Sequence, residues 1–372
     1  MSTIIGRMGD SYDVVVIGLG GIGGHAALRL AERGRSVLGL DAYRPPHTLG
    51  SSHGNSRVIR EAYFEGLQYM PLIRRAYTLW NELEQRLGRR LVHTTGAALL
   101  GPPESETLRG VQAAGRECGV ALAPLTDRDR RVFRLHDPVT GLREARGGWI
   151  ETEPAIAAVL ELAAAEGAQL RFDTPVFGID RDGAACRVRT ADGEYEAERV
   201  VMAAGAWNPA LVPELAGVLE VERQVLVWFD PLPESPDCVW VAEWRDGHYV
   251  YGFPPDADGL KLALHHDGRA TTPDAIDRDV SDADTDALRE AVADLLGPLG
   301  AVRRSTTCMY TNTPDHHFAF GPLPGDPRIV VASACSGHGF KFLPATGEAV
   351  AALACGEAPP VDVSGFTVDR LL

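Results

Sequence analysis

The chain has 372 residues, of which 45% are hydrophobic and 23% are charged, a composition typical of a soluble globular protein. This length exceeds the size at which a single hydrophobic core stops growing, so we expect two domains. The formal net charge of −15 argues against a nucleic-acid partner, because binding to phosphates requires a basic surface.

Targeting signals and cysteine usage indicate the compartment. The first ten residues contain no apolar segment long enough for a signal peptide, and no run approaches the ~20 apolar residues of a spanning helix. The six cysteines are far apart and form no CxxC pair: Cys118, Cys186, Cys238, Cys308, Cys335 and Cys355. We therefore expect a cytoplasmic protein with free thiols, no membrane partner and no metal site.

The stretch from residue 12 to 41 predicts a dinucleotide-binding unit. A buried strand at 13–17 leads into the GxGxxG sequence of residues 18–23, then a helix at 26–33 and a second strand at 36–40 that ends on Asp41. This order of strand, glycine loop, helix, strand and acid is far more specific than the glycines alone. It does not distinguish NAD from FAD.

Each glycine of the GxGxxG sequence has a structural role. Gly18 permits the tight turn, Gly20 lets the backbone approach a pyrophosphate, and Gly23 lets the helix pack closely on the strand. The N–H groups at the helix start would face the phosphates. Asp41 would accept a hydrogen bond from a ribose hydroxyl of the adenosine.

The next segment, residues 50–61, combines small residues, hydroxyls, a histidine and two arginines. It fits a loop against an anionic ligand, but on residue types alone a solvated polar loop is the better interpretation. Apolar residues then recur at helical spacing over 69–87 and predict an amphipathic helix, with Trp80 in the core. A strand is expected at 94–100.

The middle of the chain is predicted to contain one helix followed by two groups of strands. We predict a helix over 153–166 and then strands at 169–172, 176–181, 186–190 and 195–201, with a hairpin turn at 191–193. The last strand runs into the small residues and glycine of 203–207, where a second glycine approach to the cofactor favours FAD over NAD. Short β-rich segments at 222–229, 239–244, 249–253 and 260–265 predict an antiparallel sheet that covers the cofactor and shapes a substrate pocket.

The last part of the chain repeats the order of strand, glycine loop and helix found at the start. A strand at 328–332 is followed by the glycine-containing loop 333–342 and a helix over 344–354, whose amino terminus would point toward a flavin. We therefore predict a discontinuous cofactor domain formed by 11–90, 149–221 and 309–372. The substrate domain would comprise 91–148 and 222–308.

Several blocks resemble a known family, the monomeric sarcosine oxidases and N-methyltryptophan oxidases, which oxidise secondary amines with covalent FAD. The blocks are the opening unit, residues 50–60, Ala204-Gly205-Ala206-Trp207, Tyr251-Gly252-Phe253-Pro254 with Gly259-Leu260-Lys261, Cys308-Met309-Tyr310-Thr311 and residues 336–342. They span the whole chain in the family's order. The resemblance implies an α/β fold with a Rossmann-like FAD domain and an antiparallel-sheet substrate domain.

The resemblance also implies residue roles. Cys308 matches the cysteine that carries FAD through its sulfur, and nearby basic residues would favour its thiolate. Arg60 and Lys341 match the pair that binds the substrate carboxylate. Lys261 matches a lysine near flavin N5 that promotes the reaction of reduced flavin with oxygen; its place in an apolar strand would be costly unless it faced a polar cavity.

The remaining matches are expected to line the site. Tyr251, His265 and Tyr310 resemble residues of the amine pocket, whereas His53 and Arg57 resemble neighbours of the flavin ring. Further FAD contacts are implied at Ser51, Ser52, Val176, Gly205, Trp207, Met309, Gly337, Gly339 and Lys341. On residue type alone, a lone histidine or tyrosine is more often structural.

The chain departs from the family at three places. It has Asn55-Ser56-Arg57 where Asp-Thr-Arg is frequent, Asp315-His316-His317-Phe318 where an acid more often precedes the aromatic residue, and a shortened loop at 255–258. The last change puts the size of the amine pocket in doubt.

We interpret the sequence as an FAD-dependent oxidase of secondary amino acids such as sarcosine, which yields an imine and hydrogen peroxide and acts as a monomer on a small-molecule amine and oxygen. Three alternatives stay open. They are an oxidase of cyclic imino or primary amino acids, a flavin-dependent dehydrogenase or assembly subunit that is inactive alone, and a nicotinamide dehydrogenase.

Overall fold

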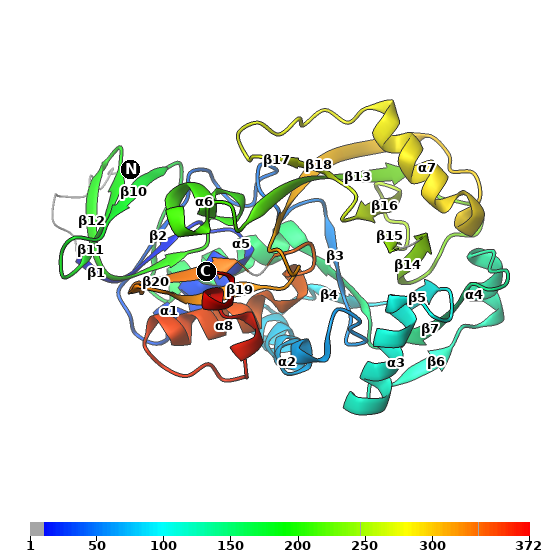
Figure 1. The fold of residues 1–372 in the computed structure, drawn as a ribbon, viewed down its shortest axis with the longest axis horizontal. Helices are drawn as coiled ribbons and strands as arrows, with labels where there is room; N and C mark the ends of the chain where they lie inside the picture. Colours follow the sequence, from blue (N-terminus) through cyan, green and yellow to red (C-terminus); the bar gives the residue numbers. More distant parts are fainter. Residues whose placement is uncertain (1–10, 246, 334) are drawn as a thin grey trace.

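The structure is a computed structural model that describes residues 11–245, 247–333 and 335–372. Two lobes lie side by side along the longest axis (Figure 1). One lobe contains an eight-stranded sheet and the other a nine-stranded sheet, and a three-stranded sheet lies apart from these two. The predicted α/β architecture with a separate, largely antiparallel second sheet is confirmed.

The eight-stranded sheet has a parallel centre and antiparallel additions. Strands β20, β12, β1, β2 and β9 pair in parallel, β10 and β11 extend β12 as an antiparallel meander, and β19 pairs with β20. The bounds are β1 Ser11–Ile17, β2 Val37–Leu40, β9 Gln169–Arg171, β10 Val176–Asp180, β11 Cys186–Thr190, β12 Gly193–Met202, β19 Ala319–Leu323 and β20 Asp326–Ser333. The opening strands are almost wholly buried, as both-sided burial of a parallel sheet requires.

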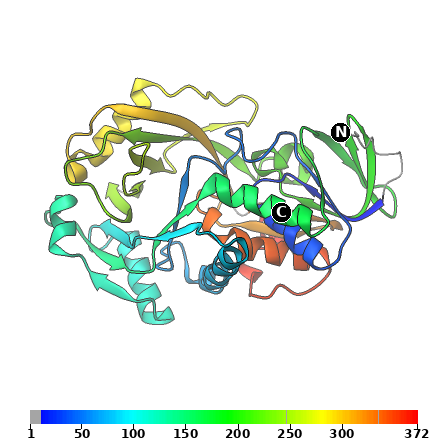
Figure 2. The same cartoon turned by 180° about the vertical axis from the view of Figure 1, so that it is seen from behind.

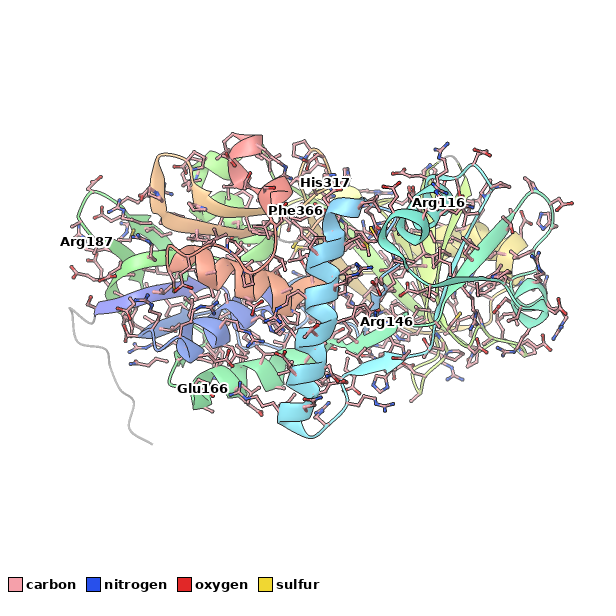
Figure 3. The ribbon with its side chains drawn as sticks, turned by 90° about the horizontal axis from the view of Figure 1, so that it is seen from below. Arg116, Arg146, Glu166, Arg187, His317 and Phe366 are labelled. Carbon is pink, nitrogen blue, oxygen red and sulfur yellow. The ribbon has the colours of Figure 1, made fainter. Side chains whose placement is uncertain are left out.

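Four helices pack around this sheet. Helix α1 (Gly21–Glu32) packs against α5 (Thr152–Ala165) and α8 (Leu343–Ala354), and α2 (Met70–Leu87) packs against α8. Figure 2 shows α5 crossing the back of the molecule, and Figure 3 shows α2 along the underside with Phe366 and His317 beside one end. Helix α1 begins five residues earlier than predicted because the glycine loop itself forms its first turn.

The nine-stranded sheet is antiparallel except where β5 pairs in parallel with β14. Its order is β17, β13, β16, β15, β14, β5, β7, β6, with β18 paired to β13. The bounds are β5 Ala97–Gly101, β6 Leu122–Pro124, β7 Thr140–Glu144, β13 Glu220–Phe229, β14 Val239–Arg245, β15 His248–Gly252, β16 Leu260–His265, β17 Arg269–Thr271 and β18 Val302–Asn312. The same lobe contains three helices: α3 (Glu106–Cys118), α4 (Asp127–Val132) and α7 (Asp282–Leu296). The short helix α6 (Asn208–Leu211) follows β12 in the other lobe.

The predicted single strand at 94–100 is wrong. The segment contains parts of two strands that belong to different sheets. Strand β4 (Val92–Thr94) pairs with β8 (Gly148–Glu151), which also pairs with β3 (Ser56–Ile59), whereas β5 belongs to the nine-stranded sheet. Gly96 has φ +78, a left-handed conformation that interrupts a strand. Its N–H donates to the Gly147 carbonyl instead of to either ladder.

The predicted domain division stays a prediction. Strand β18 runs without interruption through the proposed boundary at residue 308 and pairs along its length with β13. No helix in the part of the chain that the structure describes is long and apolar enough to cross a membrane.

Trp80 is a core residue, as predicted. Its side chain is 1% exposed, and its Nε1 donates to the Lys341 carbonyl oxygen at 2.9 Å. Because Lys341 precedes α8, this bond fixes the segment before α8 to helix α2.

We expect Gly23→Ala to destabilise the fold. A Cβ at Gly23 would lie 1.8 Å from the Gly18 carbonyl oxygen, so α1 would have to move off β1, at a cost of about 3 kcal/mol. Urea unfolding of the apoprotein measures the loss. Gly20→Ala is the matched control, since a Cβ there meets no atom within 4 Å; equal stability of the two variants would contradict the expectation.

Candidate cofactor and substrate site

A cavity of about 670 Å³ lies where the parallel strands end. Residues at the carboxyl ends of β1, β2, β12 and β20 line it, together with residues from β13, β14, β15, β16 and β18 of the other lobe. A ligand site at the carboxyl edge of a doubly wound sheet is the general arrangement of such folds. The cavity therefore collects segments that are more than 300 residues apart in the chain.

The cavity brings together most of the predicted site residues. Those that line it are Gly18, Gly20, Asp41, Ser51, Ser52, Arg57, Arg60, Val176, Gly205, Trp207, Tyr251, His265, Cys308, Met309, Tyr310, Gly337, Gly339 and Lys341. Three predicted residues do not line it: Gly23, His53 and Lys261. Gly23 instead permits the contact between α1 and β1 described above.

The glycine loop leaves room for a phosphate group. Gly18 has φ +90, and a Cβ there would lie 2.4 Å from the Ala203 carbonyl oxygen, whereas Gly20 borders open space. Helix α1 has no side-chain cap and no acidic residue in its first turn. Its first N–H groups are thus available for an anion, which fits the pyrophosphate of a dinucleotide.

Asp41 lies at the end of β2 and holds the loop in place. Its Oδ2 accepts from the Leu19 N–H at 2.7 Å and its Oδ1 from the Tyr43 N–H at 2.9 Å. Burial raises the pKa of this carboxyl group, against the effect of these two hydrogen bonds. Each oxygen retains a lone pair for a ribose hydroxyl.

Cys308 lies on β18 and faces the cavity, with 2% of its surface exposed. Its Sγ lies 3.6 Å from Arg57 Nη2 and 3.3 Å from the Ser51 carbonyl oxygen. The same Arg57 nitrogen donates to Ser51 O at 2.8 Å. The thiol thus donates to the Ser51 carbonyl oxygen while the Arg57 guanidinium faces the same sulfur.

Two cations occupy one end of the cavity. Arg60 donates to Glu65 Oε1 at 2.5 Å and to the Ala62 carbonyl oxygen at 2.6 Å, whereas Lys341 Nζ donates to the His338 carbonyl oxygen at 2.7 Å. Burial and the neighbouring Arg60 lower the pKa of Lys341 to about 7. Burial disfavours the Glu65 carboxylate, but Arg60 outweighs this and keeps the pKa of Glu65 below its usual value.

Sequence reasoning missed Glu65 and Phe64. Both line the cavity, and the Arg60 guanidinium lies 4.3 Å from the centre of the Phe64 ring, a stacking distance that helps to hold its orientation. The signal was an acid and an aromatic residue directly after the arginine-rich segment 50–61. The buried His53, Arg60 and Glu61 also show that this segment is not a solvated loop.

Neutral aromatic groups complete the same end of the cavity. Tyr310 Oη lies 3.0 Å from His265 Nδ1 and hydrogen-bonds with Tyr251. Burial raises the pKa of both tyrosines and lowers the pKa of His265 well below its ordinary value. These side chains are therefore uncharged near neutral pH, and they shape and polarise the pocket.

The glycine of the second loop makes room for these rings. Gly337 has φ +76, and a Cβ there would lie 2.5 Å from Tyr310 and 2.7 Å from His265. The segment continues through Gly339 and Lys341 into α8, so the predicted strand, glycine loop and helix are present.

Lys261 is buried behind the cavity wall. Its Nζ donates to the carbonyl oxygens of Gly54 and Ser56 at 2.7 and 2.8 Å and lies 4.5 Å from the centre of the Phe253 ring. Burial, reinforced by Arg57, lowers its pKa well below the usual value for lysine. Lys261 thus fixes the backbone of the segment that carries Arg57.

His53 lies on the same segment with 0% exposure. Neither ring nitrogen has a hydrogen-bond partner among the described residues, and burial, followed by the charge of Arg57, lowers its pKa to about 3. His53 is thus a neutral, fully buried side chain that does not line the cavity.

The structure explains the departure at Asn55. Its Nδ2 donates to Asp258 Oδ2 at 2.6 Å, and its Oδ1 accepts from Arg304 at 3.2 Å. Asp258 belongs to the shortened loop, and Arg304 also binds it at 2.6 Å. An aspartate at position 55 would place a second carboxylate against Asp258, so the asparagine suits the short loop.

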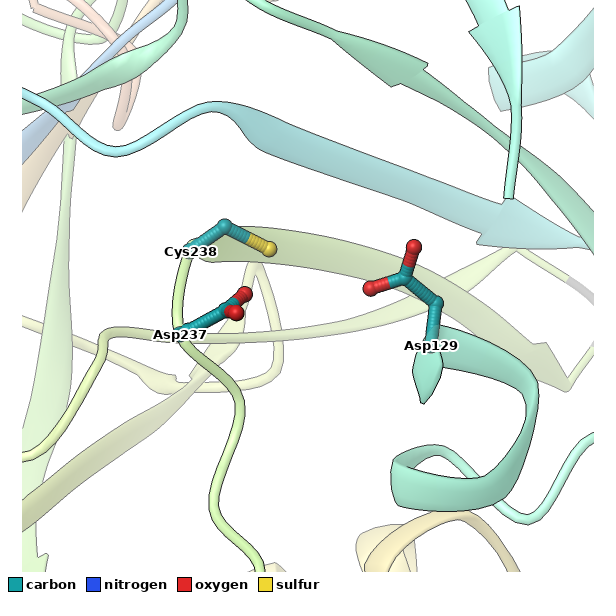
Figure 4. Close-up of side chains that lie close together, drawn as sticks. All are labelled: Asp129, Asp237 and Cys238. Atoms are coloured by element: carbon teal, nitrogen blue, oxygen red, sulfur yellow. The ribbon is translucent and has the colours of Figure 1, made fainter. Parts of the chain in front are cut away.

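One cluster of metal-ligand side chains lies elsewhere, with Asp129, Asp237 and Cys238 within 4.8 Å of one another (Figure 4). Arg143 donates to both carboxylates, at 2.9 and 2.7 Å. Burial raises the pKa of Cys238 to about 12, which keeps the thiol protonated. The cluster is an ion-pair network that joins α4 to the start of β14.

Glycine loop, acid and cavity define a dinucleotide-binding oxidoreductase fold. The model of the FAD dependent oxidoreductase family matches residues 13–353. The chain belongs to this family, and its relatives indicate FAD-dependent oxidation of amines.

Curated relatives cover nearly the whole chain. A monomeric sarcosine oxidase of Streptomyces avermitilis is 40% identical over 93% of this chain and 94% of its own length. An N-methyl-L-tryptophan oxidase of Yersinia pestis is 33% identical over 96% of this chain and 99% of its own length.

Solved structures show the same fold. NikD, described as an unusual amino acid oxidase essential for nikkomycin biosynthesis, has a TM-score of 0.83 at 28% identity and covers 96% of this chain and 97% of its own. Glycine oxidase from Geobacillus kaustophilus has a TM-score of 0.78 at 24% identity, with 98% and 100% coverage. At that identity the second likeness concerns the fold alone.

Proposed function

We propose that the chain is an FAD-dependent oxidase of N-methyl and other secondary α-amino acids, which are converted to imines while oxygen is reduced to hydrogen peroxide. The observation that carries this proposal is the pair of buried basic side chains, Arg60 and Lys341, at one end of a cavity whose lining also includes Cys308. The names of the relatives, sarcosine oxidase and N-methyl-L-tryptophan oxidase, support the same substrate class.

The residues at the other end of the cavity would hold the cofactor. The α1 N-terminus and Gly20 would receive the pyrophosphate, and Asp41 the ribose. Cys308, with Arg57 at its sulfur, is the proposed point of covalent attachment. When bound, FAD supplies the chemistry, since it accepts two electrons and a proton from the amine and passes them to oxygen.

Arg60 and Lys341 would orient the substrate through its carboxylate. Arg60 offers a planar fork and Lys341 a point charge, and Phe64 and Glu65 hold Arg60 in place. The positive field of these groups and Arg57 also disfavours a protonated amine nearby. It thereby favours the neutral amine, whose nitrogen lone pair assists oxidation of the adjacent carbon.

Lys261 is the proposed source of positive charge for the oxygen reaction. It is buried in an apolar strand, and no carboxylate within ion-pair distance of Nζ is found among the described residues. Its Nζ lies against the backbone that carries Arg57, so a charge there acts across the cavity wall in a medium of low dielectric constant.

We further propose a cytoplasmic monomer. All six cysteines are free, which suits a reducing compartment. We also propose the division into a discontinuous FAD domain and a substrate domain, with its boundary shifted so that the whole of β18 belongs to the substrate domain.

The covalent attachment is tested by acid precipitation of the purified protein. We expect flavin absorbance to remain with the washed pellet for the native chain and to move to the supernatant for Cys308→Ala, because only the thiol can retain the cofactor after unfolding. Cys335→Ala is the matched control, since Cys335 also lines the cavity. Colour that stays with the pellet of Cys308→Ala would refute the assignment.

The substrate class is tested by oxygen uptake and peroxide formation with sarcosine, N-methyl-L-tryptophan, proline and glycine. We expect turnover of the N-methyl amino acids by the purified chain alone, and none of the corresponding amines without a carboxylate. A yellow protein that turns over none of them would favour an assembly subunit instead.

The carboxylate clamp is tested by the pH dependence of binding. Lys341 is charged below its pKa of about 7 and neutral above it, so the Kd of acetate as a competitive ligand should rise about tenfold between pH 7 and 9. Lys341→Arg should remove this rise, because arginine stays charged. A pH-independent Kd for the native chain would exclude Lys341 from the clamp.

Lys261→Met is expected to separate the two half-reactions. Anaerobic flavin reduction by substrate should stay within about threefold of the native rate, whereas reoxidation by oxygen should slow by two orders of magnitude or more, on the order of the 10²–10³ lost with one electrostatic group. Stopped-flow spectroscopy measures both rates. Equal slowing of both would indicate that Lys261 acts only by holding the Gly54–Ser56 backbone.

A further inference from the structure

Phe177 is an unusual surface residue. Among the large hydrophobic side chains that the structure describes, it is the most exposed, at 64%, ahead of Leu372 at 51% and Val302 at 40%. It also lines the cavity, which Val302 and Leu372 do not. Single exposed apolar side chains are common, so it is the position of Phe177 in the cavity lining that points to ligand contact.

The backbone turns this residue toward the cavity. Phe177 lies on β10, and the pairing of β10 with β11 shifts register between Val176 and Gly178. Such a register shift changes the direction of a side chain from the one that regular alternation along the strand would give. Val176, its neighbour, lines the cavity as well, so two successive side chains border the same space.

The position of Phe177 relative to the glycine loop identifies which end of the cavity it borders. The segment before β10 is hydrogen-bonded to the end of β2, because the Thr174 N–H donates to the Asp41 carbonyl oxygen at 2.8 Å and the Asp173 N–H to the Tyr43 carbonyl oxygen at 3.3 Å. Asp41 is the residue proposed to bind the adenosine ribose. Phe177 therefore borders the adenosine end, opposite Arg60 and Lys341.

We propose that Phe177 is a cofactor-binding residue that stacks on the adenine ring of FAD. This inference rests on the cofactor position proposed above. Adenine presents a flat π face and no charge, so an exposed phenyl ring is a suitable stacking partner. In the bound state the ring would cover much of the surface that Phe177 exposes.

The experiment compares reversible flavin binding by full-length variants. Cys308→Ser is the background, so that flavin binds without a covalent bond, and the quenching of flavin fluorescence gives the Kd of FAD and of FMN, which lacks the adenosine. Phe177→Ala should raise the Kd of FAD about tenfold or more and leave that of FMN unchanged. Phe177→Tyr should bind FAD like the background, as should Val302→Ala, the matched exposed control.

Two results would overturn the proposal. An unchanged Kd of FAD in Phe177→Ala would exclude stacking, and an equal rise for FAD and FMN would indicate a general effect on the fold. Failure of the cofactor position itself is distinguishable, because the Cys308→Ser background would then bind FAD no more tightly than FMN before Phe177 is changed.

Discussion

The parallel pairing of β1, β12 and β20 is the constraint on which the site depends. Because parallel strands end at the same edge, this pairing brings three separate turns together, after Ile17, Met202 and Ser333. Each turn carries glycine and lines the cavity. The cofactor site is thus a property of sheet topology, and individual side chains adjust it.

Buried basic side chains are the second determinant of the site. The exposed fractions of Arg60, Lys261 and Lys341 are each 5% or less. Of these three, Arg60 forms an ion pair with Glu65. Removing such charges from water is costly unless hydrogen bonds compensate, and here backbone carbonyl oxygens accept from all three. Neutral carbonyl oxygens, which carry no opposing charge, hold Lys261 and Lys341, whereas Arg60 is also paired with the Glu65 carboxylate.

The glycine loop and its acid could be predicted because their requirements are local. Gly18 needs a positive φ and Gly23 needs the absence of a Cβ, and both needs are visible in the spacing of the sequence. The roles proposed for Cys308, Lys261 and Lys341 rest on the resemblance to a family, because no local pattern marks them. None of these signals gave the direction of the Lys261 side chain, because its carbonyl partners come from a segment about 200 residues earlier.

Other features depend on contacts that a linear pattern does not contain. Residues 94–100 have the composition of one strand, but Gly96 divides them between two sheets. The pairing of Glu65 with Arg60 arises within a short segment, yet its importance depends on burial by distant elements. The β-bulge at Phe177 likewise depends on the register of two neighbouring strands and has no signature in residue type.

The pairing of β12 with β20 has a consequence for the order of folding. The sheet that holds the glycine loop begins at residue 11 but is completed only by β20, and α1 packs against α8, which ends at Ala354. The early strands therefore gain their last partners only after β20 and α8 have been synthesised, although domains generally fold from the N-terminus as they emerge. The three glycine-containing turns that line the cavity can come together only after β20, which ends at Ser333, has been synthesised.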